Sequence, residues 1–157
     1  MAGPIRWLLL SYRLPREPST PRIFAWRKLR SLGVAQLSDG LVALPLDNRN
    51  REQFEWLANY ISESHGEASL WISEAATRAA ERELVSAMSQ AAAEDYRAVA
   101  IQAARAKREA RVARRRFLLR LRRELQRIRS RDYFPPPERK LAEEAVESLA
   151  ARVEVRA

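Results

Sequence analysis

The first third of the chain alternates short apolar runs with amphipathic stretches. Residues 5–12 (Ile-Arg-Trp-Leu-Leu-Leu-Ser-Tyr) are apolar, aromatic and short, a pattern typical of a buried strand. Three prolines then interrupt the chain, and Ser19 or Thr20 is placed to cap a helix that has Pro21 in its first turn. Gly33 is expected to end this helix. The apolar face of the helix is predicted to contain Ala25, Trp26, Leu29 and Leu32.

Three further apolar runs predict strands. Residues 34–37 and 41–44 flank a Ser-Asp-Gly turn sequence, which indicates a β-hairpin. Residues 68–72 (Ala-Ser-Leu-Trp-Ile) predict a last strand. Between the hairpin and this strand, Asn50 and Gln53 fit the capping box that opens a helix. The apolar residues of that helix follow the i, i+3, i+4, i+7 rule: Phe54, Leu57, Ala58 and Ile61.

The order of these elements predicts the fold class. Residues 1–73 give β-α-β-β-α-β, the order of a ferredoxin-like sandwich, in which one antiparallel sheet packs two helices on one face. We therefore predict an α+β fold, followed by a long, Arg-rich helical extension over residues 74–131 that contains almost only good helix formers. Residues 132–157 are predicted to form a proline-rich turn and a C-terminal helix over 138–151. The apolar face of that helix is expected to contain Leu141, Ala145, Val146 and Leu149.

The long helical segment carries a heptad pattern. Apolar residues recur at alternating steps of four and three, and most of them are alanines: Ala92, Tyr96, Val99, Ala103, Ala106, Ala110, Ala113 and Phe117. An Ala-rich seam allows helices to approach closely but buries little area, so it favours a partner helix. We predict a homodimer through this seam. An unbroken helix over the segment would extend for ~85 Å, so we also expect a break, near residues 89–95.

The charge of the chain is concentrated in one stretch. The chain has 29 Lys and Arg against 20 Asp and Glu, a net charge of +9. Residues 105–131 hold 13 of the basic and two of the acidic residues, so the net charge of this stretch, +11, exceeds that of the whole chain. All but three of the basic residues are arginines, and the planar guanidinium matches the geometry of phosphate.

The basic stretch predicts a helix that binds nucleic acid. Two arginine stripes accompany an apolar stripe of Phe117, Leu121, Leu125 and Ile128. These arginines repel one another unless a polyanion neutralises them. If about six of them contact phosphates, the logarithm of the affinity should fall with log salt at a slope of roughly −5. A membrane-surface helix and a solvated or partner-facing surface are the alternatives. The predicted nucleic-acid-binding residues are Arg108, Arg111, Arg115, Arg116, Arg120, Arg122, Arg123 and Arg127, with Arg27, Lys28 and Arg30 as a second patch.

The loop after the first strand is a weaker candidate for an oxyanion site. It places arginines and hydroxyl groups around a predicted helix N-terminus, which has free N–H groups and a positive dipole. The alternative interpretation is a capped, proline-stiffened turn with solvated arginines. The candidate oxyanion-binding residues are Arg13, Arg16, Ser19, Thr20 and Arg22.

The composition argues against catalysis and metal binding. The chain has no Cys, which removes disulfides, thiol nucleophiles and cysteine-ligated metals. Its single histidine, His65, argues against a transition-metal site. We predict no catalytic residue, no metal, no cofactor and no enzyme activity. No apolar run approaches the ~20 residues of a membrane span, so we expect a cytoplasmic protein without membrane contact.

Three stretches of the sequence resemble a known family. Residues 7–33, the tripeptide Ala43-Leu44-Pro45 and residues 128–135 (Ile-Arg-Ser-Arg-Asp-Tyr-Phe-Pro) resemble the N-terminal domain of the chromate-resistance regulator family, ChrB. The resemblance implies a transcriptional regulator of a chromate efflux operon, with DNA as partner and chromate as candidate effector. Family members commonly continue into a second domain associated with sensing, and no part of this chain corresponds to it.

Two functions are therefore open at the level of the sequence. The first is a DNA-binding transcriptional regulator that controls chromate resistance, in which the arginine-rich helix contacts phosphates. The second is a non-catalytic oxyanion-binding or protein-interaction module whose basic helix meets an acidic partner.

Overall fold

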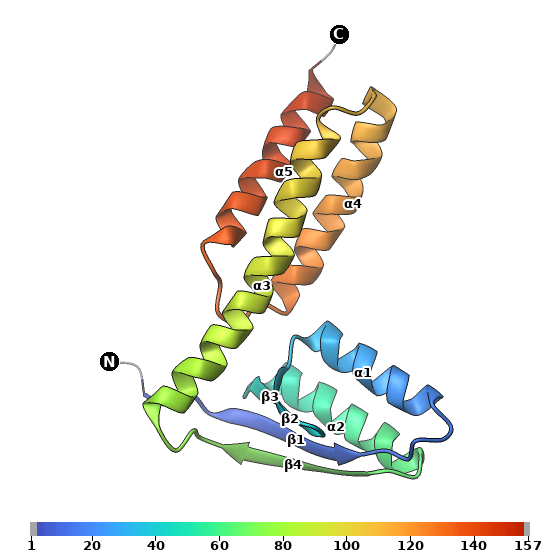
Figure 1. The fold of residues 1–157 in the computed structure, drawn as a ribbon, viewed down its shortest axis with the longest axis vertical. Helices are drawn as coiled ribbons and strands as arrows, with labels where there is room; N and C mark the ends of the chain where they lie inside the picture. Colours follow the sequence, from blue (N-terminus) through green and yellow to red (C-terminus); the bar gives the residue numbers. More distant parts are fainter. Residues whose placement is uncertain (1–2, 156–157) are drawn as a thin grey trace. The chain divides into compact units, whose positions relative to one another are not determined.

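Four antiparallel strands form the sheet of the first unit of the chain. The computed structural model describes residues 3–155 and divides between Ala87 and Met88 into two units (Figure 1). Within the described part of the chain, the strand order is β2-β3-β1-β4, and each neighbouring pair is antiparallel. The strands lie within about two residues of their predicted positions: β1 is Trp7–Arg13, β2 is Ala35–Ser38, β3 is Leu41–Pro45 and β4 is Glu67–Ser73.

Helices α1 (Thr20–Leu32) and α2 (Asn48–Glu63) cover one face of this sheet (Figure 1). The register aligns Leu8 with Leu44 and Leu10 with Val42, so these side chains share a face. All of them are fully buried, together with the predicted stripe of α2, because the helices exclude water from this side. The α2 residues of this core are Phe54, Leu57 and Ile61.

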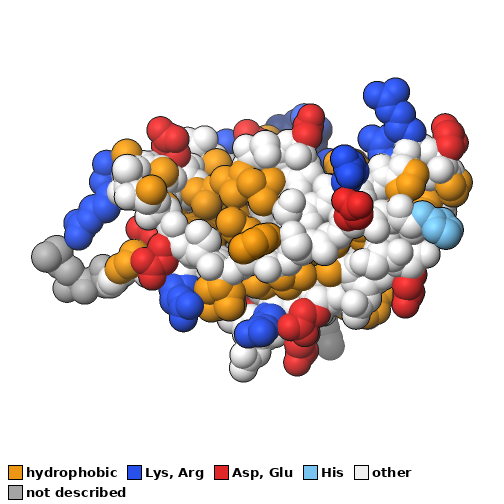
Figure 2. Space-filling model, turned by 90° about the horizontal axis from the view of Figure 1, so that it is seen from below, with side chains coloured by type: hydrophobic (Ala, Val, Ile, Leu, Met, Phe, Trp, Pro, Cys, Tyr) orange, Lys and Arg blue, Asp and Glu red, His pale blue; other side chains and the backbone are white. Residues whose placement is uncertain are grey.

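The opposite face of the sheet also carries apolar side chains. The register places Leu9 between Ala43 and Trp71 on that face. Trp71 is 61% exposed. Hydrophobic side chains gather on the side of the molecule seen in Figure 2. The apolar run of β1, which predicted a buried strand, thus places apolar side chains on both faces of the sheet.

The N-terminus of α2 differs from the prediction. The capping box of Asn50 and Gln53 is wrong, because α2 begins at Asn48 and its N-cap is Asp47. The Asp47 carboxylate accepts a hydrogen bond from the backbone N–H of Asn50 over 2.7 Å. Asn50 is buried and donates from Nδ2 to the carbonyl of Pro45 over 2.9 Å. Asp47 and Asn50 therefore fix the turn between β3 and α2.

Three helices form the second unit. Helix α3 (Arg78–Ala106) runs from the first unit into it, and α4 (Arg111–Ser130) and α5 (Glu138–Glu154) complete it. The Ala-rich face of α3 packs against the larger side chains of α4 and α5 in one core. Small residues facing large ones let the helices interlock closely. The core contains Ala92, Tyr96, Val99, Ala103, Ala106, Leu118, Leu121, Leu125, Ile128, Ala142, Val146, Leu149 and Ala150.

The helical break lies further along the chain than predicted. Residues 89–95 are helical, and the chain turns at residues 107–110, a stretch without Gly or Pro. Backbone hydrogen bonds from Arg108 to Arg105 and from Glu109 to Ala106 close this turn. Burial of the leucines of α4 against the alanines of α3 outweighs the helix propensity of the turn residues.

The heptad seam has a partner within its own chain. Its residues from Ala92 to Ala106 are buried, whereas Ala110 lies in the turn and is exposed. Because α4 and α5 cover the seam, these residues need no second copy of the chain to become buried. The homodimer through the seam stays a prediction.

The proline-rich turn leads into α5 as predicted. Helix α5 begins at Glu138, directly after Pro137, and extends to Glu154. The predicted apolar face is shifted by one position at its start, because Leu141 is 59% exposed and Ala142 is buried instead. Residues 3–155 therefore form an α+β structure with one four-stranded antiparallel sheet and five helices, which confirms the predicted class.

Candidate nucleic-acid interface

Helix α4 carries the densest positive charge in the described part of the chain. Arginine holds nine of its 20 positions, and Glu124 is its one acidic residue. Leu118, Leu121, Leu125 and Ile128 form the buried face. Leu118 takes the place predicted for Phe117, which is half-buried. Because the leucines fix α4 on the bundle, the arginines are presented outward on a rigid helix.

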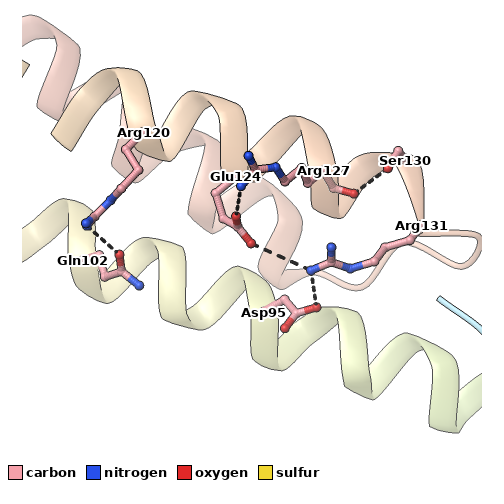
Figure 3. Close-up of polar contacts among 7 residues, drawn as sticks. All are labelled: Asp95, Gln102, Arg120, Glu124, Arg127, Ser130 and Arg131. Atoms are coloured by element: carbon pink, nitrogen blue, oxygen red, sulfur yellow. Dashed lines mark hydrogen bonds and ion pairs between the residues drawn. The ribbon is translucent and has the colours of Figure 1, made fainter. Parts of the chain in front are cut away.

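Carboxylates neutralise the arginines at the C-terminal end of α4 (Figure 3). Arg127 pairs with Glu124 at 3.4 Å. Arg131 pairs with Asp95 at 3.0 Å and with Glu124 at 3.9 Å. Arg129 pairs with Glu143 of α5 at 3.0 Å. This end of the helix is therefore tied to its neighbours, and of the predicted binding residues it contains only Arg127.

Two more arginines of α4 have uncharged partners. Arg120 donates to Oε1 of Gln102 over 3.1 Å (Figure 3). Its guanidinium lies 4.7 Å from the centre of the Phe117 ring. Arg114 is half-buried and donates to the carbonyl of Lys107 over 3.5 Å. Arg120 was predicted to bind nucleic acid. In the structure, Gln102 and Phe117 hold its guanidinium in place, and no described carboxylate pairs with it.

Six other arginines, in the turn before α4 and along the helix as far as Arg123, are different. Within residues 3–155, no side-chain hydrogen bond or ion pair joins them to another residue, and all of them are exposed. They are Arg108, Arg111, Arg115, Arg116, Arg122 and Arg123, all of them predicted binding residues, and we call them the free arginine set. The arginines of α4 that follow Glu124 thus have carboxylate partners, whereas those before it have none among the described residues.

The second predicted patch lies on α1, in the first unit. Arg27 is exposed, Lys28 lies 5.6 Å from the centre of the Trp56 ring, and the Arg30 guanidinium lies 5.0 Å from the centre of the Trp26 ring. Helix α1 contains no acidic residue. The patch is therefore cationic and partly held over aromatic rings.

The sequence analysis did not predict an aromatic cluster that lies beside this patch. Phe24 of α1 lies 4.4 Å from Tyr60 and 5.8 Å from Trp56 of α2, between ring centres. The Trp56 and Tyr60 rings are stacked at 5.9 Å. Phe24 and Trp56 are among the exposed large hydrophobic residues. The signal in the sequence is the i, i+4 spacing of Trp56 and Tyr60 outside the apolar stripe of α2.

The candidate oxyanion site is dispersed over an exposed loop. Arg13 at the end of β1 pairs with Glu67 of β4 at 3.1 Å, and both side chains are largely exposed. Ser19 is the N-cap of α1, but its side chain makes no capping hydrogen bond. Arg16, Thr20 and Arg22 are exposed. Arg13 thus has a carboxylate partner, and oxyanion binding by these five residues stays a prediction.

A buried polar network, which the sequence analysis also missed, anchors the turn after α4. The Tyr96 hydroxyl donates to Oδ2 of Asp132 over 2.8 Å, and Arg139 lies 3.9 Å from the same oxygen. Burial, with the Asp132 hydrogen bond, raises the pKa of Tyr96 well above its usual value. Hydrogen bonds from Arg139 and from Arg129 lower the pKa of Glu143. This network holds α3, the turn and α5 together.

Two features are absent from residues 3–155. In that range, no group of three or more His, Cys, Asp or Glu side chains is arranged to hold a metal ion. Among the described helices, none combines the length and the apolar character that crossing a membrane requires.

Comparison with known proteins places the chain in a family. Residues 22–157 match the family described as Protein ChrB, N-terminal. The chain belongs to the ChrB N-terminal family. This confirms the resemblance seen in the sequence, and the ChrB family is a regulatory family of chromate resistance. The match includes α4 and both predicted basic patches, whereas Arg13, Arg16, Ser19 and Thr20 precede it. Neither the curated proteins nor the solved structures gave a match.

Proposed function

We propose that this ChrB-family chain is a DNA-binding transcriptional regulator of chromate resistance, and that the free arginine set on and before α4 contacts DNA phosphates. The observation that carries the proposal is the uneven pairing along α4. Arg127, Arg129 and Arg131 have carboxylate partners, whereas Arg115, Arg116, Arg122 and Arg123 have none.

Uncompensated charge at this density is costly without a polyanion. Like charges three or four positions apart on a helix destabilise it by roughly 0.2–0.5 kcal/mol per pair. The carboxylates of Glu124, Glu143 and Asp95 remove this cost at the C-terminal end of α4. For the arginines before Glu124, DNA phosphates would remove this cost and release counterions, which favours binding.

The first unit supports the same proposal at the level of the fold. We assign it to the ferredoxin-like sandwiches, and three features support the assignment: the β-α-β-β-α-β order, the strand order β2-β3-β1-β4 and the two helices on one face of the sheet. In this proposal the sheet unit is a scaffold, and α4 makes the main contacts to DNA.

The direct test is charge removal on α4. Replacing Arg115, Arg116, Arg122 and Arg123 by Gln should lower the affinity for duplex DNA by roughly 100-fold or more at 0.1 M salt. These side chains are exposed and Gln is a good helix former, so the variant should stay folded by circular dichroism.

A matched control removes the same charge elsewhere. Replacing four other exposed arginines by Gln also lowers the net charge from +9 to +5: Arg6, Arg51, Arg82 and Arg152. This control variant should keep most of the wild-type affinity. An equal loss in both variants would mean that only net charge matters, and an unchanged affinity in the α4 variant would place the DNA site elsewhere.

A protein-interaction role is the second candidate, supported by the aromatic cluster of α1 and α2. Aromatic side chains are enriched at protein interfaces. Phe24 and Trp56 present such a surface next to Lys28. If this role is the main one, Phe24→Ala with Trp56→Ala should abolish binding to the partner and leave the affinity for DNA unchanged.

A further inference from the structure

An exposed leucine of α4 is surrounded by arginines. Leu119 is 48% exposed, on the side of the helix opposite the buried stripe. On a helix surface, the neighbours of a residue are those three and four positions before and after it. For Leu119 all of these neighbours are arginines of the free arginine set: Arg115, Arg116, Arg122 and Arg123. An apolar side chain thus lies inside a frame of four guanidinium groups.

Leu119 is the middle of a line of uncharged residues, which we call the α4 ridge. Val112 precedes it by seven positions and is 68% exposed, and Gln126 follows it by seven positions and is exposed. Seven residues are close to two helical turns, so the three side chains lie nearly in line. Arg115 and Arg122 flank this ridge on one side, and the other flank contains Arg116 and Arg123.

The ridge and its flanks specify what can bind there. The ligand must present anionic groups along both sides of the helix and apolar or hydrogen-bonding groups between them. The DNA major groove, about 12 Å wide, admits an α-helix of about 10–12 Å diameter between two rows of phosphates. Its floor carries thymine methyl groups and the N6 and N7 atoms of adenine. A second copy of α4 would instead bring two arginine frames together.

We infer, on the basis of the proposed function, that α4 enters the major groove of duplex DNA and that Leu119 and Gln126 read bases there. Leu119 contacts a thymine methyl group. The Gln126 amide donates to N7 and accepts from N6 of an adenine. The flanking arginines contact the phosphates of the two strands and fix the register of the helix. These phosphate contacts carry no sequence information by themselves.

The test uses a library of random duplex DNA. The full chain and the variants Leu119→Ala and Gln126→Ala are incubated with the library, and the retained duplexes are sequenced. Both side chains are exposed and Ala is the best helix former, so both variants should fold. Leu141→Ala is the matched control, because Leu141 is an exposed leucine of α5 with Glu138 and Glu144 at its i−3 and i+3 positions.

The expected result has two parts. The wild type and Leu141→Ala should enrich one shared motif, and each ridge variant should lose the preference at one or two positions of it. For the enriched duplex, each ridge variant should bind about tenfold more weakly, whereas its affinity for a scrambled duplex should change less than about twofold.

Four outcomes overturn the inference, and they differ in what they mean for the proposed function. If the wild type retains duplexes without enriching a motif, or if both ridge variants enrich the wild-type motif with wild-type affinity, base reading by the ridge is wrong while phosphate contact by α4 stands. If the wild type retains no duplex at all, DNA binding itself is wrong. If an added acidic polypeptide abolishes the retention of duplexes and an equal amount of competitor DNA does not, α4 would be assigned to an acidic protein partner.

Discussion

At the scale of single residues, the pair of Tyr96 and Asp132 joins α3 to the turn after α4. The Asp132 side chain is 1% exposed, and the Tyr96 hydroxyl is 2.8 Å from its Oδ2 atom. A buried carboxylate that loses a donor keeps the cost of its desolvation. The hydroxyl of Tyr96 therefore stabilises the folded state by offsetting part of the desolvation cost of the Asp132 carboxylate.

Removal of this hydroxyl should destabilise the bundle. Tyr96→Phe keeps the ring and should lower the free energy of unfolding by about 1–3 kcal/mol. The measurement is hydrogen exchange of the α3, α4 and α5 amides, because all four tryptophans lie in the first unit. Tyr60→Phe, at a half-buried position of α2, is the control and should change little. Unchanged exchange in Tyr96→Phe would contradict the role of the hydrogen bond.

Glu143 gives the bundle a pH dependence with a defined sign. Arg139 and Arg129 lower the pKa of folded Glu143 below its ordinary value of 4.5. The folded state then binds fewer protons than the unfolded state, so this stabilisation is complete above pH 4.5 and is lost as the pH falls through the folded pKa.

The Glu143→Gln variant tests this linkage. It should be less stable than the wild type at pH 7 and should lose less stability than the wild type on acidification below pH 4.5. Denaturant titrations of both proteins between pH 3 and pH 7 measure the difference. Parallel stability curves over this range would show that the Glu143 carboxylate contributes nothing through its charge.

At the scale of elements, local sequence patterns predicted the helices and strands, and packing decided the rest. The apolar runs of β1 and β4 and the i, i+3, i+4 stripe of α2 are local signals, and these elements were found where expected. The turn at residues 107–110 contains no helix breaker. Its position is determined by the packing of α4 against the alanines of α3. A single sequence does not contain that information in any local window.

The candidate site was predictable to the same extent. The charge count located the arginines of α4. Which of them are free depends on Asp95 and Glu143, which lie far from Arg131 and Arg129 in the sequence. The outward position of Leu119 follows from the buried face of α4, of which the sequence analysis predicted Leu121, Leu125 and Ile128 correctly and only the first residue, Phe117 in place of Leu118, wrongly.

The start of α4 offers a stability test that is independent of DNA. Its N-cap is Ala110, whose side chain makes no capping hydrogen bond. Ala110→Ser supplies a hydroxyl that can accept from the N–H groups of the first turn and should stabilise the protein by about 1 kcal/mol. A denaturant midpoint in Ala110→Ser equal to that of the wild type would mean that the observed start of α4 is not its start in solution.

At the scale of the whole molecule, family membership and charge distribution support the same proposal. The ChrB match covers residues 22–157 and contains both units from α1 onward. The net charge of +9 depends on residues 105–131, whose own net charge is +11. Because the positive and negative charges outside residues 105–131 nearly cancel, α4 and the turn before it dominate the electrostatic field that a polyanion meets.

Chromate binding by the loop after β1 is a separate prediction, and thermal unfolding can test it. If the loop residues Arg13, Arg16, Ser19, Thr20 and Arg22 bind oxyanions selectively, chromate should raise the melting temperature more than an equal concentration of sulfate. An equal effect of the two anions would reduce this loop to a general anion-binding surface and would leave the DNA proposal untouched.

The most direct test of the central claim is the salt dependence of duplex DNA binding by the wild-type chain. If the six arginines of the free arginine set contact phosphates, the logarithm of the association constant should fall with the logarithm of salt concentration at a slope of roughly −5. Fluorescence anisotropy between 50 and 300 mM salt measures this slope. A flat response, or no binding at the lowest salt concentration, would contradict the proposal that α4 meets DNA.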